Sequence, residues 1–162
     1  MGYYVRAFCT SEKVPTIKEI LDWVKTQGYE LEVAPDFKDS NLDTDKWEQV
    51  GIIYKKGKLP FLSEVNVDDG SDDRLIKDEI EEFKEFLEEV NGLLNWNKKK
   101  VLKHLRETKY IIANQIPTSD FDDDGYNANG EFLNYFVKYC GGMIQADGEG
   151  FYEGNKLIVK LD

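Results

Sequence analysis

The chain has 162 residues, of which 41% are hydrophobic and 33% are charged, so it holds enough apolar material for the core of one domain spanning 1–162. Its formal net charge is −11, and a molecule this acidic is repelled by nucleic acid and by anionic membrane surfaces. We therefore expect neither of these as a partner, but another protein or a second copy of the chain. The alternative is that the acidity serves only solubility.

The cysteines and the first residues bear on the cellular location. Cys9 and Cys140 both lie in apolar-patterned segments, and two cysteines are too few to cross-link a chain of this size, so we expect buried, reduced thiols. The N-terminal residues lack a basic stretch followed by an apolar run, which a signal peptide requires. No apolar run approaches the length of a membrane span. The sequence therefore predicts a cytoplasmic protein.

The first part of the chain predicts strands around one helix. Residues 3–9 are rich in β-branched and aromatic side chains, which is typical of a strand. Thr16 and Glu19 form a capping-box pair at the start of a helix that Gly28 ends. The next predicted strands are 29–33, 49–56 and 59–67.

The middle of the chain predicts two helices. The acidic segment 68–73 is expected to cap the first, because carboxylates are stabilised at the positive end of a helix dipole. Asn91-Gly92 is expected to end it, and a basic helix of roughly 98–108 follows. The apolar stripe of the first helix is Ile76, Ile80, Phe83, Leu87 and Val90.

The last part predicts a strand at 110–116, a helix, and two further strands at 143–152 and 156–161. Gly141-Gly142 is expected to end the helix. The apolar face of this helix comprises Phe132, Leu133, Phe136, Val137 and Cys140.

These elements favour an α+β fold, with a mixed or largely antiparallel sheet and helices packed on one face. Residues 23–33 and 136–146 also align, since each has an aromatic-Val-Lys run followed by Gly. A variant of the fold is therefore two ferredoxin-like halves that arose by duplication, 3–67 and 110–161. The alternative is that helix ends converge on these residue types for ordinary reasons.

The stretch DFDDDGYNANGE, residues 120–131, matches the pattern of a calcium-binding loop. Such a loop offers side-chain oxygens at alternate positions, then a backbone carbonyl, then a bidentate Glu at the end. A structural Ca²⁺ is one interpretation of this stretch, though not the favoured one; the stretch resembles the EF-hand loop and no more of that fold. The ligands would be Asp120, Asp122, Asp124, the carbonyl of Tyr126, and Glu131.

Two features depart from the EF-hand pattern. Asn127 stands where paired EF-hands have an aliphatic residue, and the segment before the loop is a predicted strand, not a helix. The alternative is a turn that starts a helix, with Asp side chains capping their own backbone. In that case Gly125 would have a positive φ and Asn129 would be the N-cap residue.

The glycine-rich stretch 147–154 is a second candidate loop. Asp147 and Glu149 would contact a ligand there, or join Glu64 in a carboxylate cluster. The favoured interpretation is a turn or bulge that glycine permits between the C-terminal strands. His104 is the single histidine and lies among lysines, where it would be a poor metal ligand or general base. We assign no catalytic residue.

The Lys-rich stretch 98–109 is the one basic patch of this acidic chain. It would dock an acidic partner or an acidic patch of a second copy, or it is simply solvated. Trp47 and Trp96 lie near polar segments. An exposed tryptophan suggests an interface anchor, but the favoured interpretation is that each ring folds back over the edge of the core.

The combination of FDDDGYNANGEFLNYF with GGMIQADGEGFYEG resembles, over most of the chain, an uncharacterised group of small acidic bacterial proteins. The resemblance implies no assigned activity and no site residues.

Three functions are compatible with these features. The first is a cytosolic, non-enzymatic binding or interaction module with a divalent cation at 120–131. The second is a carboxylate-dependent enzyme that uses acids of 120–131 and 147–153. It requires the acids of the two segments to converge in one concave site. The third, supported by charge alone, is an acidic inhibitor of a basic enzyme.

Overall fold

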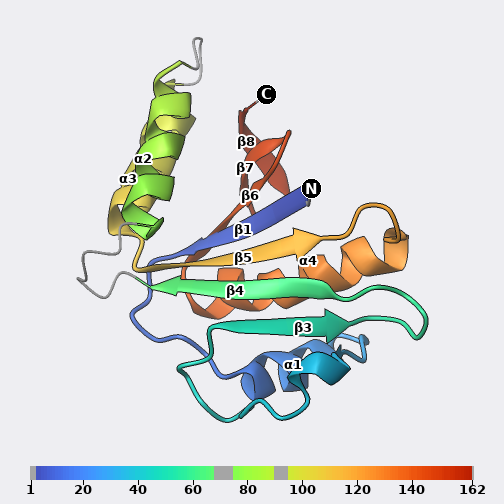
Figure 1. The fold of residues 1–162 in the computed structure, drawn as a ribbon. Helices are drawn as coiled ribbons and strands as arrows, with labels where there is room; N and C mark the ends of the chain where they lie inside the picture. Colours follow the sequence, from blue (N-terminus) through green and yellow to red (C-terminus); the bar gives the residue numbers. More distant parts are fainter. Residues whose placement is uncertain (1–2, 68–74, 90–94, 162) are drawn as a thin grey trace.

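The protein is described by a computed structural model that covers residues 3–67, 75–89 and 95–161 (Figure 1). The helices are α1 (Ile17–Thr26), α2 (Leu75–Glu88), α3 (Asn95–Glu107) and α4 (Asp123–Tyr139), with a short 3₁₀ helix, η1, at Pro35–Phe37. The strands are β1 (Tyr3–Cys9), β2 (Glu32–Val33), β3 (Gln49–Ile53), β4 (Phe61–Val67), β5 (Tyr110–Ile116), β6 (Gly142–Ala146), β7 (Gly150–Glu153) and β8 (Lys156–Lys160).

All eight strands form one sheet in the order β2-β3-β4-β5-β1-β6-β7-β8. Every neighbouring pair is antiparallel. The predicted α+β class with a largely antiparallel sheet is therefore confirmed. The long central strands β1 and β5 pair along their whole length, from Tyr3 opposite Ile116 to Cys9 opposite Tyr110.

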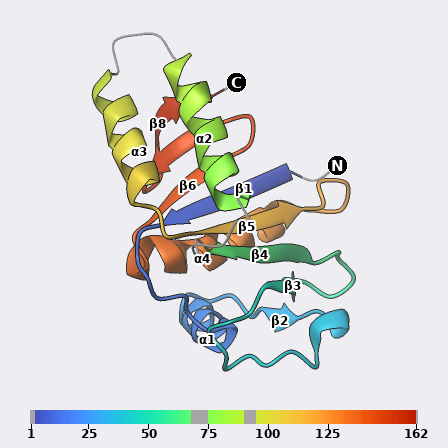
Figure 2. The same cartoon turned by 60° about the vertical axis from the view of Figure 1, so that its left-hand side comes forward.

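Helices cover both faces of this sheet, whereas the sequence analysis expected them on one (Figures 1 and 2). The reason is that successive side chains of a strand point to opposite faces, and both sets are apolar in the central strands. Ala7 and Cys9 join the core under α1 and α4. Phe8 and Ile111 join a second core under α2 and α3. Two apolar faces require two covering layers.

The local start and stop signals agree closely with the structure in α1. The Thr16 side chain accepts a hydrogen bond from the backbone N–H of Glu19, and the Glu19 side chain accepts one from the backbone N–H of Thr16. Together they complete the capping box. Gly28 follows the helix at a φ of +94°. The predicted strand at 29–33 is shorter, because only Glu32–Val33 pair with β3. The predicted acidic cap at 68–73, Val90 and Asn91-Gly92 lie outside the described residues.

The strand predicted at 143–152 is two strands, since β6 and β7 are separated by a turn at 147–149. Gly148 and Gly150 adopt φ values of +73° and +138° there. The expectation of a glycine-permitted turn in this segment is thus met.

The repeated strand–helix–strand units exist as β1-α1-β2 and β5-α4-β6. They do not form two separate sheets, because β6 and β5 lie on either side of β1. The first unit instead ends at the sheet edge, with three strands between β1 and β2. Whether a duplication produced them stays a prediction.

Among the described residues, no helix is both long enough and apolar enough to cross a bilayer.

The turn at Gly150 provides a test of the fold near the candidate site. A Cβ at this position would overlap the carbonyl oxygen of Val159 on β8, and the φ of +138° is one that other residues rarely adopt. We expect Gly150→Ala to lower the free energy of unfolding by about 3 kcal/mol in urea denaturation. The matched control is Gly130→Ala in α4, where a Cβ meets no atom within 4 Å. It should raise stability by up to about 1 kcal/mol, and equal losses in both variants would contradict the turn geometry.

Candidate functional site

The predicted calcium loop is the start of a helix in this structure. Helix α4 begins at Asp123, so Glu131 lies in its third turn. Asp122 is the N-cap residue and accepts a hydrogen bond of 3.1 Å from the backbone N–H of Gly125. The alternative of a helix start is thus present, but its N-cap residue lies seven residues before Asn129. Gly125 is not among the residues with positive φ.

Asn129 is buried inside α4 and does not cap it. Its Oδ1 accepts a 2.8 Å hydrogen bond from Nδ2 of Asn114 on β5. Asp122 accepts from a free N–H of the first turn, that of Gly125, so the helix begins there. Asn129 therefore falls inside α4, on the face that the helix turns to the sheet.

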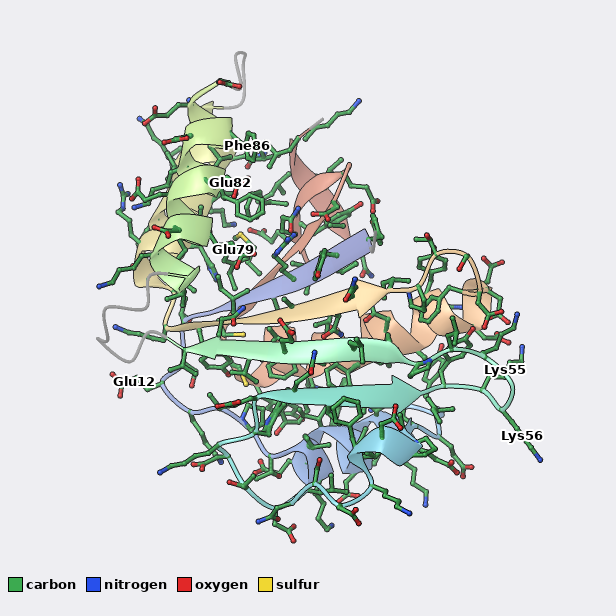
Figure 3. The ribbon with its side chains drawn as sticks, viewed as in Figure 1. Glu12, Lys55, Lys56, Glu79, Glu82 and Phe86 are labelled. Atoms are coloured by element: carbon green, nitrogen blue, oxygen red, sulfur yellow. The ribbon has the colours of Figure 1, made fainter. Side chains whose placement is uncertain are left out.

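Lysines of the β3–β4 turn form ion pairs with three of the carboxylates predicted to bind calcium, Asp120, Asp122 and Asp124. Lys55 Nζ lies 3.1 Å from Asp122 Oδ2 and 2.9 Å from Asp124 Oδ2. Hydrogen bonds to Asp124 and then Asp122 raise the pKa of Lys55 to about 12. Asp120 accepts the N–H of Leu59 at 2.8 Å. Lys55 thus supplies the positive charge that a bound cation would otherwise bring to Asp122 and Asp124. Figure 3 labels Lys55 at the tip of this turn.

Of the other two predicted ligands, Glu131 lies more than two turns of α4 beyond Asp122, and the Tyr126 carbonyl belongs to the backbone of the same helix. Glu131 accepts a hydrogen bond from Nδ2 of Asn134, one turn along α4. The Tyr126 ring packs edge-on against Phe121, with centroids 5.3 Å apart. Within the described residues, no group of three or more His, Cys, Asp or Glu side chains is placed to hold a metal. Calcium binding at 120–131 therefore stays a prediction.

Glu149 is held by two tyrosines. Its Oε2 accepts from the hydroxyl of Tyr3 at 2.5 Å, and its Oε1 accepts from the hydroxyl of Tyr152 at 2.6 Å. The hydrogen bond to Glu149, followed by burial, raises the pKa of Tyr152. This arrangement ties β1 to the β6–β7 turn.

Asp147 takes part in a different cluster, centred on Arg6 of β1, which the sequence analysis did not single out. Arg6 Nε donates to Glu79 of α2 at 2.5 Å. Arg6 Nη1 donates to Asp147 at 2.7 Å and to Gln145 of β6 at 2.8 Å. The strand register accounts for this meeting, because Arg6 stands directly opposite Gln145. One guanidinium thus connects a helix, two strands and a turn.

Aromatic rings complete the surroundings of Arg6. Its guanidinium carbon lies 5.0 Å from the ring centre of Tyr4 and 5.5 Å from that of Phe83. Glu79 and Phe83 are one turn apart on α2, so they face the sheet together. The Arg6 and Glu79 side chains are only 15% and 21% exposed. In such a site each charge depends on its partner, because neither is well solvated.

This cluster forms the floor of a cleft of about 640 Å³ between α2 and the sheet, which we call the α2 cleft. Figure 3 shows Glu79, Glu82 and Phe86 along the side of α2 that borders it. Its lining comprises Arg6, Gln145 and Asp147 on the floor, Glu79, Glu82, Phe83, Phe86 and Glu89 on α2, and Gly148, Lys160 and Leu161 on the opposite side.

The acids of the α2 cleft differ in their partners. Glu79 and Asp147 share the single positive charge of Arg6. Glu82 and Glu89 are exposed, and no ion pair joins either to another residue of the described chain. Phe86 lies between them and is 46% exposed. The cleft therefore presents an apolar ring flanked by two carboxylates.

A larger hollow of about 940 Å³ lies at the other end of the sheet. Val67 and Ile76 border it, on either side of residues 68–74, which the structure does not describe. We therefore place the candidate site at the α2 cleft.

The remaining candidate residues, His104 and the two cysteines, lie where they serve the fold and not a binding site. His104 is half-buried, with Nε2 2.7 Å from the carbonyl oxygen of Phe8, so it connects α3 to β1 and does not lie on an exposed face. Cys9 and Cys140 are free and buried, as expected. Burial raises the pKa of both thiols, and a thiol that stays protonated is a weak nucleophile.

Arg6 provides the first test of the site. Arg6→Ala would leave Glu79 and Asp147 without their cation, so we expect the free energy of unfolding to fall by about 2–4 kcal/mol in urea denaturation. The control is Lys18→Ala, which removes an exposed pair with Asp22 on α1. Exposed pairs contribute little, so this change should cost less than about 0.5 kcal/mol. A loss at Arg6 no larger than that at Lys18 would contradict the clustered arrangement.

Glu79 provides a test by pH. Burial raises its pKa above the usual 4.5, although the charge of Arg6 acts to lower it. A carboxyl with a raised pKa in the folded state holds its proton better there, so it favours folding at low pH. That contribution is lost as the pH rises through the elevated pKa. Relative to Glu79→Gln, the parent should therefore lose stability as the pH rises from about 4 toward neutrality. Urea denaturation across this range measures it, and a relative gain in the parent would contradict it.

No family model matches this chain, and no curated protein or solved structure is similar enough to it to count as a match.

Proposed function

We propose that this protein is a cytosolic, non-enzymatic binding module, and that the α2 cleft takes a basic side chain of a partner protein. The observation that carries the proposal is the pair of exposed carboxylates, Glu82 and Glu89, on either side of the exposed Phe86 ring. The cleft already contains a cation, Arg6, but its charge is taken up by Glu79 and Asp147. Lys160 on the opposite side is a second cation of the lining, but the four carboxylates, Glu79, Glu82, Glu89 and Asp147, outnumber the two cations, so the cleft carries a net negative charge.

The chemistry of lysine and arginine side chains suits this lining. Their long apolar stems pack on a hydrophobic surface while the charged end stays at its edge. Phe86 would receive the stem, and its ring face also attracts a cation. Glu82 and Glu89 would accept charge-assisted hydrogen bonds from the ammonium or guanidinium group. The net charge of −11 would add a long-range attraction for a basic partner.

The enzyme alternative has less support. It requires acids of 120–131 and 147–153 to converge. Among the described contacts, Asp122 and Asp124 pair with Lys55, whereas Asp147 pairs with Arg6 and Glu149 with tyrosines. The two groups of acids thus have separate partners. Glu79 has a raised pKa in a cleft, but its hydrogen bond to Arg6 favours a structural role.

The test is the affinity of the full chain for a fluorescent arginine-rich peptide, measured by anisotropy at low ionic strength. We expect Glu82→Gln with Glu89→Gln to weaken binding about tenfold or more, because charged hydrogen bonds are lost. The control with the same change in net charge is Glu30→Gln with Asp36→Asn, since both acids are exposed near β2, at the opposite edge of the sheet. It should change the affinity less than about twofold. Equal effects of the two variants would mean that only net charge attracts the peptide.

A further inference from the structure

Helices α2 and α3 carry opposite charges. Within Leu75–Glu88, six acids and two lysines give α2 a formal charge of −4. Within Asn95–Glu107, five lysines and arginines and one Glu give α3 a formal charge of +4. The two helices lie side by side (Figures 1 and 2). The first residues of α3 lie beside the last residues of α2, where Lys98 Nζ donates to the carbonyl of Glu88, so the helices run in opposite directions.

Both helices turn their apolar sides to the sheet, where Phe83 and Leu87 of α2 and Val101 and Leu105 of α3 are buried. Their opposite sides form what we call the outer face of the pair. On α2 the exposed residues of this face include Asp78, Glu81 and Glu85; Glu81 also pairs with Lys84 of its own helix at 3.2 Å. On α3 they are Trp96, Lys99 and Lys103. An acidic row therefore runs beside a basic row.

Among the described residues, Trp96 is the most exposed large apolar residue, with 80% of its surface accessible to solvent. From the sequence, both Trp47 and Trp96 are expected to fold back over the core edge. Trp47 does so, since it is buried and donates its Nε1–H to the carbonyl of Pro15. Trp96 does not. Lys99 and Lys103 follow Trp96 at helical spacing. Tryptophan is enriched among the residues that anchor interfaces, and the rim around such an anchor is polar.

The two rows select the kind of partner. A uniformly acidic surface would be attracted by α3 but repelled by α2, and a uniformly basic surface would meet the reverse. Only a surface with both charges side by side in the opposite order complements the outer face. A second copy offers such a surface when a twofold axis runs parallel to the helices, because α2 of one copy then faces α3 of the other. Every contact occurs twice in such a closed arrangement.

We propose that the outer face of the α2–α3 pair binds the same face of a second copy to form a symmetric dimer. Lys98 of α3 contacts Glu88 of α2. Because the two helices are antiparallel, Lys103, five residues after Lys98, lies level along the helix axis with Phe83, five residues before Glu88. In the partner it would therefore meet the gap between Glu81 and Glu85. Trp96, near the end of the pair, would supply the apolar contact. The α2 cleft borders this face, because Glu82 and Glu89 of its lining lie one turn after Asp78 and Glu85.

The test is sedimentation velocity of the full chain at low ionic strength and in about 0.5 M NaCl. We expect a concentration-dependent dimer at low salt that dissociates at high salt. Two charge-reversed variants, Lys99→Glu with Lys103→Glu and Glu81→Lys with Glu85→Lys, should each weaken self-association at least about tenfold. An equimolar mixture of the two should associate again, since each then offers the charge that the other lacks. This recovery also shows that both variants are folded.

A parent chain that stays monomeric at low salt would overturn the proposal, and so would a mixture that fails to associate. Trp96→Ala tests the anchor and should weaken the dimer about tenfold. Its control is Tyr139→Ala, which removes an aromatic side chain that is 54% exposed on α4. Equal effects of these two substitutions would also overturn the proposed interface.

Discussion

The charge of Arg6 in the middle of the sheet is the constraint on which one side of the molecule depends. Arg6 lies on a central strand, on the same face as the fully buried Phe8. A guanidinium cannot remain there without compensation, because burial of an unpaired charge is very unfavourable. Glu79 and Asp147 provide that compensation from α2 and from the β6–β7 turn. The ion pair with Glu79 thus joins α2 to the sheet, in addition to the apolar contacts of Phe83 and Leu87.

The two cores explain why a cleft exists beside Arg6. Helices α1 and α4 cover one face, while α2 and α3 cover the half of the opposite face toward β8 (Figure 2). Arg6 and its carboxylate partners form a polar floor beside the apolar side chains of α2, and the α2 cleft lies over this floor. The acids of α2 that Arg6 does not reach, Glu82 and Glu89, are left at the edge. A structural ion pair and a binding surface thus have a common origin.

Short-range sequence patterns predicted the local structure well. The capping box of Thr16 and Glu19 and the bounds of β5, 110–116, both agree with the structure, since each depends on neighbouring residues. The site was not predictable in this way. Arg6 and Glu79 are 73 residues apart, and only the strand register and the placement of α2 bring them together. An arginine within a predicted strand was the one available signal.

The stretch at 120–131 shows how a sequence pattern leaves two physical outcomes open. A row of alternating acids can surround a cation, or it can cap a helix and pair with lysines. Lys55, 67 residues before Asp122, favours the second arrangement in this structure. Trp96 was misplaced for a related reason, because a sequence does not reveal whether a neighbouring element covers a helix end.

The measurement that tests this account most directly is the exchange of the Arg6 Nε proton with water, followed by ¹⁵N-edited NMR of the folded protein. Exposed arginine side chains exchange this proton rapidly at neutral pH, whereas a proton held by a half-buried carboxylate is protected. The account predicts one protected Nε–H signal that is lost in Arg6→Lys and exchanges faster in Glu79→Ala. An Arg6 Nε proton that exchanges as fast as those of exposed arginines would show that Arg6 does not join α2 to the sheet.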